Sequence, residues 1–426
     1  MKKKLLFILL TCATLTANAY APYFDIKAKM VGGGIIKHSK HLENTVKNPV
    51  LGAELSIEFL PQGKYTWESY YKFPIIGLGL LGMDLGNPKI FGQAFAVYPY
   101  ALIPIVRKEH FYFHFKVGMG LAVLTKTWEH CATNEGVNSP NANAAIGSHV
   151  NAFLPIGLNF DFPIAKGWGI TSDLMFNHMS NGSIIQPNAG LNIINGFVGA
   201  TYRPNWREYM MPWRDYVKAM PRTWDLELGA AGGYRELYYK DDRGYAIASF
   251  RATAYKQLTN VYRIGFGADI FYDGVFVKQG KNLTGYLATD YARYEIVNDN
   301  FSYKWRVGIS LANEFVMGRI TAGIHWGFYL IDPIKDAYPK GTNPRYADKV
   351  TGVEKRPWPF YIYDPDKEDG WNYFRLMLKC RIVDNLFASV AIKTHLQKAE
   401  FIEWGLGYTF KFKPKKSRTD MLFPLF

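Results

Sequence analysis

Apolar residues alternate with polar residues or glycine over long stretches of this chain. Residues 110–123 are an example, and 319–330 and 402–412 follow the same pattern. The apolar positions of the first stretch are Phe111, Phe113, Phe115, Val117, Met119, Leu121 and Val123. Because successive side chains of a strand point to opposite faces, each stretch predicts a β-strand with one apolar side. Strands of about ten residues with an apolar outer face and a polar or glycine inner face are typical of a transmembrane barrel.

The connections between these stretches are of two kinds. Short turns are expected at 61–64, 258–260, 317–319 and 383–385, and long loops at 37–49, 127–147, 275–300 and 332–370. Short turns at one rim and long loops at the other are expected of an outer-membrane barrel. We therefore predict an all-β fold, a transmembrane antiparallel β-barrel of the outer membrane. The alternation indicates about eight strands before residue 204 and about eight after residue 222.

A weak internal repeat favours two modules over one continuous barrel of about 16 strands, which is the alternative. Residues 24–33 resemble 224–233, and the two halves also end alike. The domains expected are a barrel over residues 20–204, a periplasmic linker over 205–222, a second barrel-like half over 223–412 and a C-terminal tail over 413–426. The linker carries aromatic residues among charges, so it is either an amphipathic helix at the membrane surface or a plain connection.

The amino end has the three parts of a secretory signal peptide. Lys2, Lys3 and Lys4 precede the apolar run 5–10, and Ala17-Asn18-Ala19 is a small-residue cleavage site. We predict a signal peptide over residues 1–19 and an integral location in the outer membrane of a Gram-negative bacterium. No later apolar run reaches the roughly 18 residues of a membrane-spanning helix.

Charge and cysteine content narrow the possible partners. The chain has 50 Lys and Arg against 36 Asp and Glu, which gives a formal net charge of +14. A basic exported protein suits an anionic partner such as lipopolysaccharide, although solvated surface charge is an equal alternative, and no nucleic-acid partner is expected. The spacing of Cys131 and Cys380 does not decide whether they pair, and no Cys or His cluster predicts a metal. We expect no cofactor.

Two polar side chains interrupt an apolar strand face near residue 180. Residues i and i+2 share a face, so His178 and Ser180 project side by side. Their face also carries Trp168, Ile170, Leu174 and Phe176, whereas the opposite face carries Gly169, Thr171, Asp173 and Asn177. The pair is therefore predicted to face lipid, where polar groups are costly unless they have a function.

These residues can fill the roles of a serine esterase. Serine needs a neighbouring base to take its proton, and that base must be held in one tautomer. We predict Ser180 as the nucleophile, His178 as the base and Asn192, on the returning strand, as the residue that orients His178. The side chain of Asn181 or nearby backbone N–H groups would stabilise the oxyanion. The alternative is a His and a Ser that merely end a strand before an Asn181-Gly182 turn.

His178-x-Ser180-Asn181 followed by Pro187-Asn188-x-Gly190-x-Asn192 resembles the signature of the outer-membrane lipid A 3-O-deacylase (PagL), or acyloxyacyl hydrolase, family. For residues 20–204 the resemblance implies an eight-stranded barrel with a lipid-facing His/Ser/Glu triad. It also implies removal of the ester-linked acyl chain at position 3 of lipid A. The acidic residue of the family falls on Asn192, which can orient His178 but cannot stabilise an imidazolium as a carboxylate does.

The same motif is similar to that of outer-membrane phospholipase A, whose Ser/His/Asn triad sits on a calcium-dependent, twelve-stranded, dimerising barrel. The strand count and the Pro187-Asn188-x-Gly190 element favour the deacylase, and Asn192 favours the phospholipase. We therefore predict a serine esterase that acts on lipid A in the outer leaflet. Phospholipase A, with calcium as cofactor, is the alternative, and a non-catalytic porin or structural barrel is the alternative of another class.

The second half is not expected to hold another active site. In the hairpin equivalent to that of His178, it has His395 with no serine two residues on. His395 shares the face of Ser389, Ala391 and Lys393, so its side chain is expected to point inward.

Overall fold

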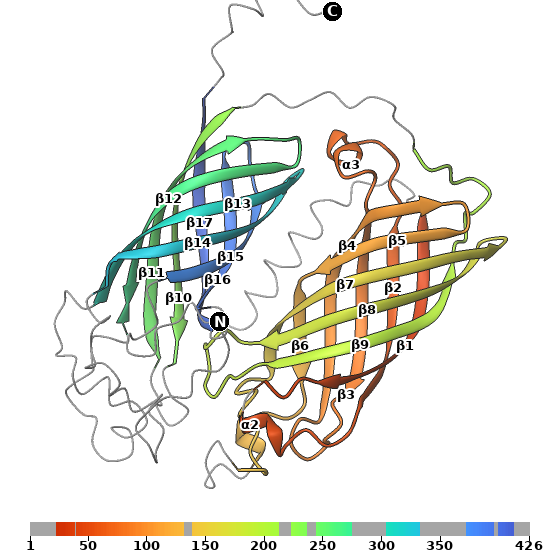
Figure 1. The fold of residues 1–426 in the computed structure, drawn as a ribbon, viewed down its shortest axis with the longest axis horizontal. Helices are drawn as coiled ribbons and strands as arrows, with labels where there is room; N and C mark the ends of the chain where they lie inside the picture. Colours follow the sequence, from red (N-terminus) through yellow and green to blue (C-terminus); the bar gives the residue numbers. More distant parts are fainter. Residues whose placement is uncertain are drawn as a thin grey trace, which may run out of the picture.

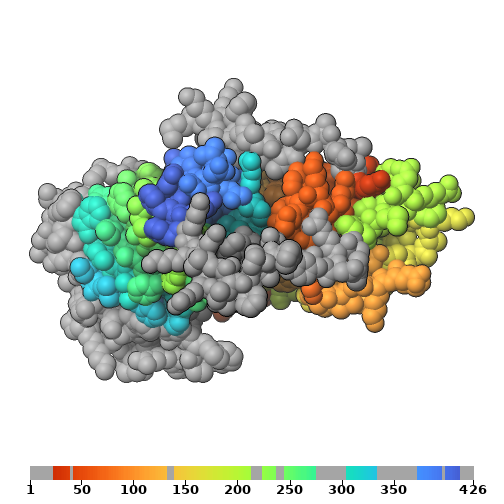
Figure 2. All heavy atoms as spheres, turned by 90° about the horizontal axis from the view of Figure 1, so that it is seen from above, coloured from red at the N-terminus to blue at the C-terminus, as the bar shows by residue number. Residues whose placement is uncertain are grey.

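The chain forms two β-sheets, each built from one half of the sequence (Figure 1). We describe a computed structural model over residues 23–38, 40–131, 139–212, 223–236, 244–274, 304–332, 372–395 and 399–412. Seen from above, the first half (red to yellow-green) and the second half (green to blue) occupy separate parts of the molecule (Figure 2). Within these ranges, no helix has the length and apolar character needed to cross a membrane.

The first sheet closes on itself. Its strands are β1 (Phe24–Ile35), β2 (Val50–Phe59), β3 (Ile75–Asp84), β4 (Gln93–Lys108), β5 (Phe111–Gly118), β6 (Gly120–Leu124), β7 (Val150–Ala165), β8 (Trp168–Ser180) and β9 (Leu191–Tyr202). Strands β5 and β6 pair with the same neighbours, β4 and β7, so they are two parts of one strand interrupted at Met119. Pairings β3–β4 and β1–β9 complete the ring. With β5 and β6 counted together, this is the expected eight-stranded barrel.

The second sheet is a closed barrel of its own. Its strands are β10 (Trp224–Arg235), β11 (Tyr245–Gln257), β12 (Tyr262–Asp273), β13 (Trp305–Met317), β14 (Ile320–Ile331), β15 (Asn372–Arg381), β16 (Leu386–Thr394) and β17 (Ala399–Phe412). Strands β10 and β17 pair and close it. The all-β class and the arrangement in two modules are confirmed, and one continuous barrel is wrong. Closure leaves no strand edge unpaired, as a hydrocarbon environment requires.

The connections follow the expected asymmetry with one correction. The turn expected at 61–64 only begins a longer connection that contains the short helix α3 (Thr66–Tyr70). The long loops after β1 and β6 contain α2 (Lys40–Glu43) and the 3-10 helix η1 (Trp128–His130). Most of the loops expected at 275–300 and 332–370 lies outside the described residues, as do the signal peptide, residues 213–222 and the tail. The described start of the linker forms hydrogen-bonded turns, with Tyr209 N 3.1 Å from Asn205 O.

Side-chain alternation divides the first barrel into an apolar outside and a charged inside. On β1, Met30 is 71% exposed, whereas Lys27 and Lys29 are buried. Lys29 Nζ lies 2.7 Å from Asp173 Oδ2 and 3.0 Å from Glu54 Oε1. Such charges are tolerated inside the barrel because each has an opposite partner.

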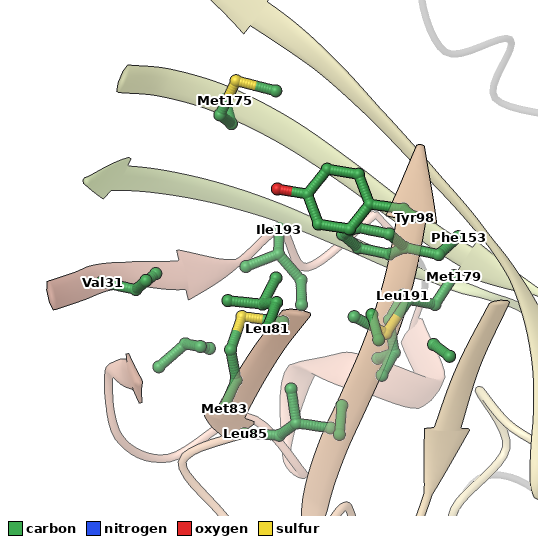
Figure 3. Packing of buried hydrophobic residues seen from close by; sticks show 14 of the residues in the cluster. Val31, Leu81, Met83, Leu85, Tyr98, Phe153, Met175, Met179, Leu191 and Ile193 are labelled. Carbon is green, nitrogen blue, oxygen red and sulfur yellow. The ribbon is translucent and has the colours of Figure 1, made fainter. Parts of the chain in front are cut away.

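One end of the first barrel is filled by apolar side chains instead (Figure 3). Residues from several strands meet there, among them Val31, Leu81, Met83, Phe153, Met175 and Met179. Met179 on β8 and Leu191 and Ile193 on β9 point into this cluster and are fully buried. Residues 178 and 192 alternate with them, so the packing that fixes the inward side chains also fixes where the outward ones project.

The second barrel is charged along much of its interior. Arg263 lies 2.6 Å from both Glu227 and Glu314, and Arg375 Nη1 lies 2.6 Å from Asp269 Oδ1. Its buried hydrophobic cluster is small, formed by Ile247, Phe271, Tyr373 and Phe401. Cys131 and Cys380 belong to different barrels and do not form a disulfide.

The two barrels touch at the end where β2 and β3 are connected. The Tyr71 hydroxyl, just after α3, donates to the carbonyls of Val261 (3.3 Å) and Val316 (3.1 Å) of the second barrel. Beside it, a Cβ atom on Gly318 would lie 3.0 Å from the Trp67 ring. The first barrel therefore contacts two turns of the second.

Candidate active site

The outward face of β8 carries the His–Ser pair, as predicted. On this strand Trp168 and Leu174 are 56% and 53% exposed, whereas Asp173 and Asn177 are almost fully buried. His178 and Ser180 have the parity of the exposed residues. The pair therefore lies on the outer surface of the barrel, at the end of the strand.

Strand register brings Asn192 to His178. The two residues are direct partners in the β8–β9 ladder, and His178 Nδ1 donates to Asn192 Oδ1 at 2.6 Å. An amide oxygen can only accept, so Nδ1 carries the ring proton and Nε2 keeps its lone pair. His178 is thereby held in the tautomer that a general base toward Ser180 needs.

Ser180 is held by two donors from the loop that follows it, residues 181–190. Its Oγ accepts from Gly182 N at 3.1 Å and from Asn188 Nδ2 at 2.8 Å. Ser180 is only 4% exposed. These contacts leave the hydroxyl proton of Ser180 free to be donated, although it makes no hydrogen bond to His178 in this structure. For Oγ to act as a nucleophile, one of its lone pairs must exchange its donor for the carbonyl carbon.

Asn181 stabilises the fold of this loop. Its Nδ2 donates to Ser148 Oγ and to Ile185 O, both at 2.9 Å, and its backbone N donates to Asn188 Oδ1 at 3.2 Å. The sequence motif contained Asn188 but did not indicate a role for it. The structure brings it next to Ser180 because the loop folds back, a contact that no strand periodicity reveals.

Glycine is required at position 190. Its φ is +76°, a left-handed conformation that costs other residues roughly 1–2 kcal/mol. A Cβ atom there would lie 3.0 Å from His178 Cε1. Gly190 thus leaves room for the imidazole next to the loop.

Nothing in the described part of the chain groups three or more His, Cys, Asp or Glu side chains into a metal site. The expectation of no metal and no cofactor stays a prediction. What the arrangement offers is acyl transfer by a serine, with His178 positioned by an amide.

Two family models match consecutive parts of the chain. Residues 51–203 match "Lipid A 3-O-deacylase (PagL)", and residues 224–350 and 359–412 match "Acyloxyacyl hydrolase, C-terminal domain". The chain belongs to the lipid A 3-O-deacylase (PagL) family. It is an outer-membrane β-barrel protein of this family, and each match falls within one of the two barrels, the first of them beginning after β1.

Solved structures resemble the chain only distantly. "Crystal structure of the outer membrane enzyme PagL" is 13% identical, with 41% of this chain and 97% of that one covered and a TM-score of 0.27. A mutant of the Rh. blastica porin is 8% identical, with 91% and 100% covered and a TM-score of 0.16. Scores this low do not add to the assignment. No curated protein matches the chain.

Proposed function

We propose that this PagL-family chain is a serine esterase that removes an ester-linked acyl chain from lipid A in the outer leaflet of a Gram-negative bacterium. The observation that carries the proposal is the 2.6 Å hydrogen bond from His178 to Asn192, on the lipid-facing side of β8, with Ser180 two residues away. A porin would place its functional polar groups in the lumen instead. The basic surplus of the sequence suits the phosphates of lipid A.

In the proposed reaction, His178 Nε2 takes the proton of Ser180 as Oγ attacks the acyl carbonyl. The tetrahedral intermediate collapses as the imidazolium returns that proton to the departing sugar oxygen. Water, deprotonated by His178, then attacks the acyl-enzyme, and the imidazolium returns the proton to Ser180 Oγ as the fatty acid is released. In each step, one proton moves from the nucleophile to His178 and then from His178 to the leaving oxygen.

The negative charge on the carbonyl oxygen needs donors close to Ser180. The Gly182 backbone N–H and the Asn188 amide already lie at 3.1 Å and 2.8 Å from Oγ, so both are within reach of an oxygen bonded to the same carbon. Asn181, the donor expected from the sequence, remains a candidate, but its amide is engaged by Ser148 and Ile185.

Asn192 is the specific observation that favours a second candidate, a calcium-dependent phospholipase A. The feature that resembles the phospholipase triad is the asparagine itself. Its amide orients the imidazole but does not neutralise the imidazolium. The eight-stranded first barrel favours the deacylase.

Purified protein in detergent distinguishes the two functions. We expect release of one hydroxylated acyl chain from lipid A, equally with and without a calcium chelator. A phospholipase would release fatty acid from phosphatidylethanolamine and lose this activity with the chelator. Cleavage of phosphatidylethanolamine alone would overturn the proposed substrate, and cleavage of neither would overturn the esterase.

A further inference from the structure

The second barrel contacts the loop that covers Ser180. Glu236, which follows β10, donates its backbone N–H to Ser183 O at 2.9 Å and accepts from Gln186 N through Oε2 at 2.9 Å. At the beginning of β17, Ala399 O accepts from Ser183 Oγ at 3.0 Å. Strands β10 and β17 are the pair that closes the second barrel. The end of β10 and the beginning of β17 therefore both contact the same loop of the first barrel.

An apolar contact from β17 reaches the same loop. Gly182 has a φ of +61°, and a Cβ atom on it would overlap Cγ1 and Cδ1 of Ile402. The backbone N–H of Gly182 is also one of the two donors to Ser180 Oγ. A side chain of the second barrel thus lies against the residue that holds the nucleophile.

The loop has its own support on the opposite side. Gly190 N donates to Ala145 O at 2.9 Å, and Ala189 N donates to Ala144 O at 3.1 Å. These bonds fix the end of the loop near β9, whereas the end near Ser180 is held by the second barrel. Small displacements of an oxyanion donor reduce the catalytic rate strongly. We therefore expect the contacts from the second barrel to affect the rate.

We propose that the second barrel is a positioning element of the active site, which holds residues 182–186 so that Gly182 and Asn188 stay in place around Ser180. This inference rests on the proposed function and assigns a role to the second half of the chain. Its residues act through the loop and do not touch the substrate.

The test uses the full-length protein with lipid A as substrate. Glu236→Ala removes the acceptor for Gln186 N and should lower kcat about tenfold with KM unchanged, because a displaced oxyanion donor weakens only the transition state. Glu236→Gln keeps an acceptor oxygen and should restore most of the rate. The matched control is Glu109→Ala, at the opposite rim, where the side chain is 87% exposed.

A second pair of variants tests the apolar contact. Gly182→Ala should lower kcat, and combining it with Ile402→Ala should recover part of the loss, because the smaller side chain makes room for the new Cβ. Ile270→Ala, an outward residue on β12, should give no recovery. Heat-modifiable mobility on gels verifies that each barrel assembles.

The outcomes separate this proposal from the proposed function. If Ser180→Ala is inactive but Glu236→Ala keeps the wild-type kcat and Ile402→Ala gives no recovery, the positioning role is wrong and the esterase stands. If Ser180→Ala stays active, the proposed site itself fails.

An independent observation concerns His38, which lies beside Asn192. Asn192 Nδ2 is 3.3 Å from His38 Nδ1, and His38 Nε2 is 3.1 Å from the carbonyl of Ala189. The amide nitrogen of Asn192 can only donate, so in this contact His38 Nδ1 is the acceptor and the proton of a neutral His38 sits on Nε2, toward Ala189 O; Nδ1 also lies 3.1 Å from Ile36 O. An amide turned the other way would present its NH2 to the Nδ1–H of His178.

We infer that His38 is a positioning residue that keeps the Asn192 oxygen turned toward His178. A carboxylate has two equivalent oxygens and needs no such orientation. An orienting partner is therefore needed only because residue 192 is an asparagine. His38→Ala should therefore lower kcat about tenfold in the natural chain and less than about twofold in an Asn192→Glu background.

This inference also depends on the proposed function. Equal losses in both backgrounds would show that His38 acts in some other way, and no loss in either would remove its role. Failure of the esterase itself would appear separately, as activity that survives Ser180→Ala.

Discussion

The two barrels have a histidine at the end of the seventh strand and orient it in opposite directions. In the first barrel His178 lies on the outward face of β8 and bonds Asn192 on the neighbouring strand. In the second barrel His395, just after β16, is 7% exposed, and its Nε2 lies 3.0 Å from Glu400 Oε2 inside the barrel. Strand parity makes the difference, because His395 shares the inward face of Lys393.

The interiors behind the two histidines differ as well. Behind His178 the lumen is filled by an apolar cluster that includes Met179, Leu191 and Ile193. Behind His395 the neighbours are charged, with Lys393 and Arg306 both paired to Glu400. The first histidine lies on the outward face of its barrel, and the second belongs to an internal ion network. A strand-end histidine is thus a candidate base only where a substrate can reach it.

The largest expected effect comes from the outward pair. Ser180→Ala and His178→Ala should each lower lipid A hydrolysis by at least about 10³-fold, and the double variant should be little worse because the residues act as a unit. Initial rates on purified lipid A measure this. Additive losses in the double variant would mean that the two residues do not share a step.

The second-largest loss of activity is expected from substitution of Asn192. Asn192→Ala removes the acceptor for His178 Nδ1 and should lower kcat at least about tenfold, because the imidazole loses its tautomer and orientation. Asn192→Glu should be tolerated or faster, since a carboxylate also stabilises the imidazolium. Steady-state kinetics of both variants decide, and unchanged rates in both would show that the contact plays no part in catalysis.

A smaller effect is expected at Gly190. Gly190→Ala places a Cβ atom 3.0 Å from His178 Cε1 at a φ of +76°, so kcat should fall by about tenfold as the ring is displaced. The matched control is Gly196→Ala, on the outward face of β9, where a new Cβ would have nothing closer than 3.9 Å. Equal rates for the two variants would contradict the close fit around His178.

The smallest effect should come from the second histidine. His395→Gln keeps a polar side chain in the lumen and should change lipid A hydrolysis by less than about twofold, since this residue lies in an internal network. His178→Gln, its counterpart, should be inactive. A large loss of activity in His395→Gln with intact heat-modifiable mobility would show that His395 also contributes to catalysis, which would contradict the difference drawn between the two barrels.

The alternation of side chains was enough to predict most of the fold. Strand number, the two-module arrangement and the outward face of β8 all depend on period-two patterns within single strands. The pairing of His178 with Asn192 was also predictable, because both residues lie on the outward face of neighbouring strands and close to the same end of each.

Contacts made by loops could not be predicted in this way. Asn188 reaches Ser180 only because residues 181–190 fold back over the strand end, and Glu236 reaches the same loop from the other barrel. The interruption at Met119 and the helix α3 were not predicted either. Such contacts depend on irregular loop backbone or on residues far apart in sequence, so no strand periodicity encodes them.

The central claim is that Ser180 on the lipid face of the first barrel cleaves an acyl ester of lipid A. Mass spectrometry of lipid A from cells that produce the natural chain, the Ser180→Ala variant or neither tests it most directly. The account predicts loss of the mass of one hydroxylated acyl chain only with the natural chain. The same loss with Ser180→Ala at equal amounts of assembled barrel, or no loss with the natural chain, would contradict it.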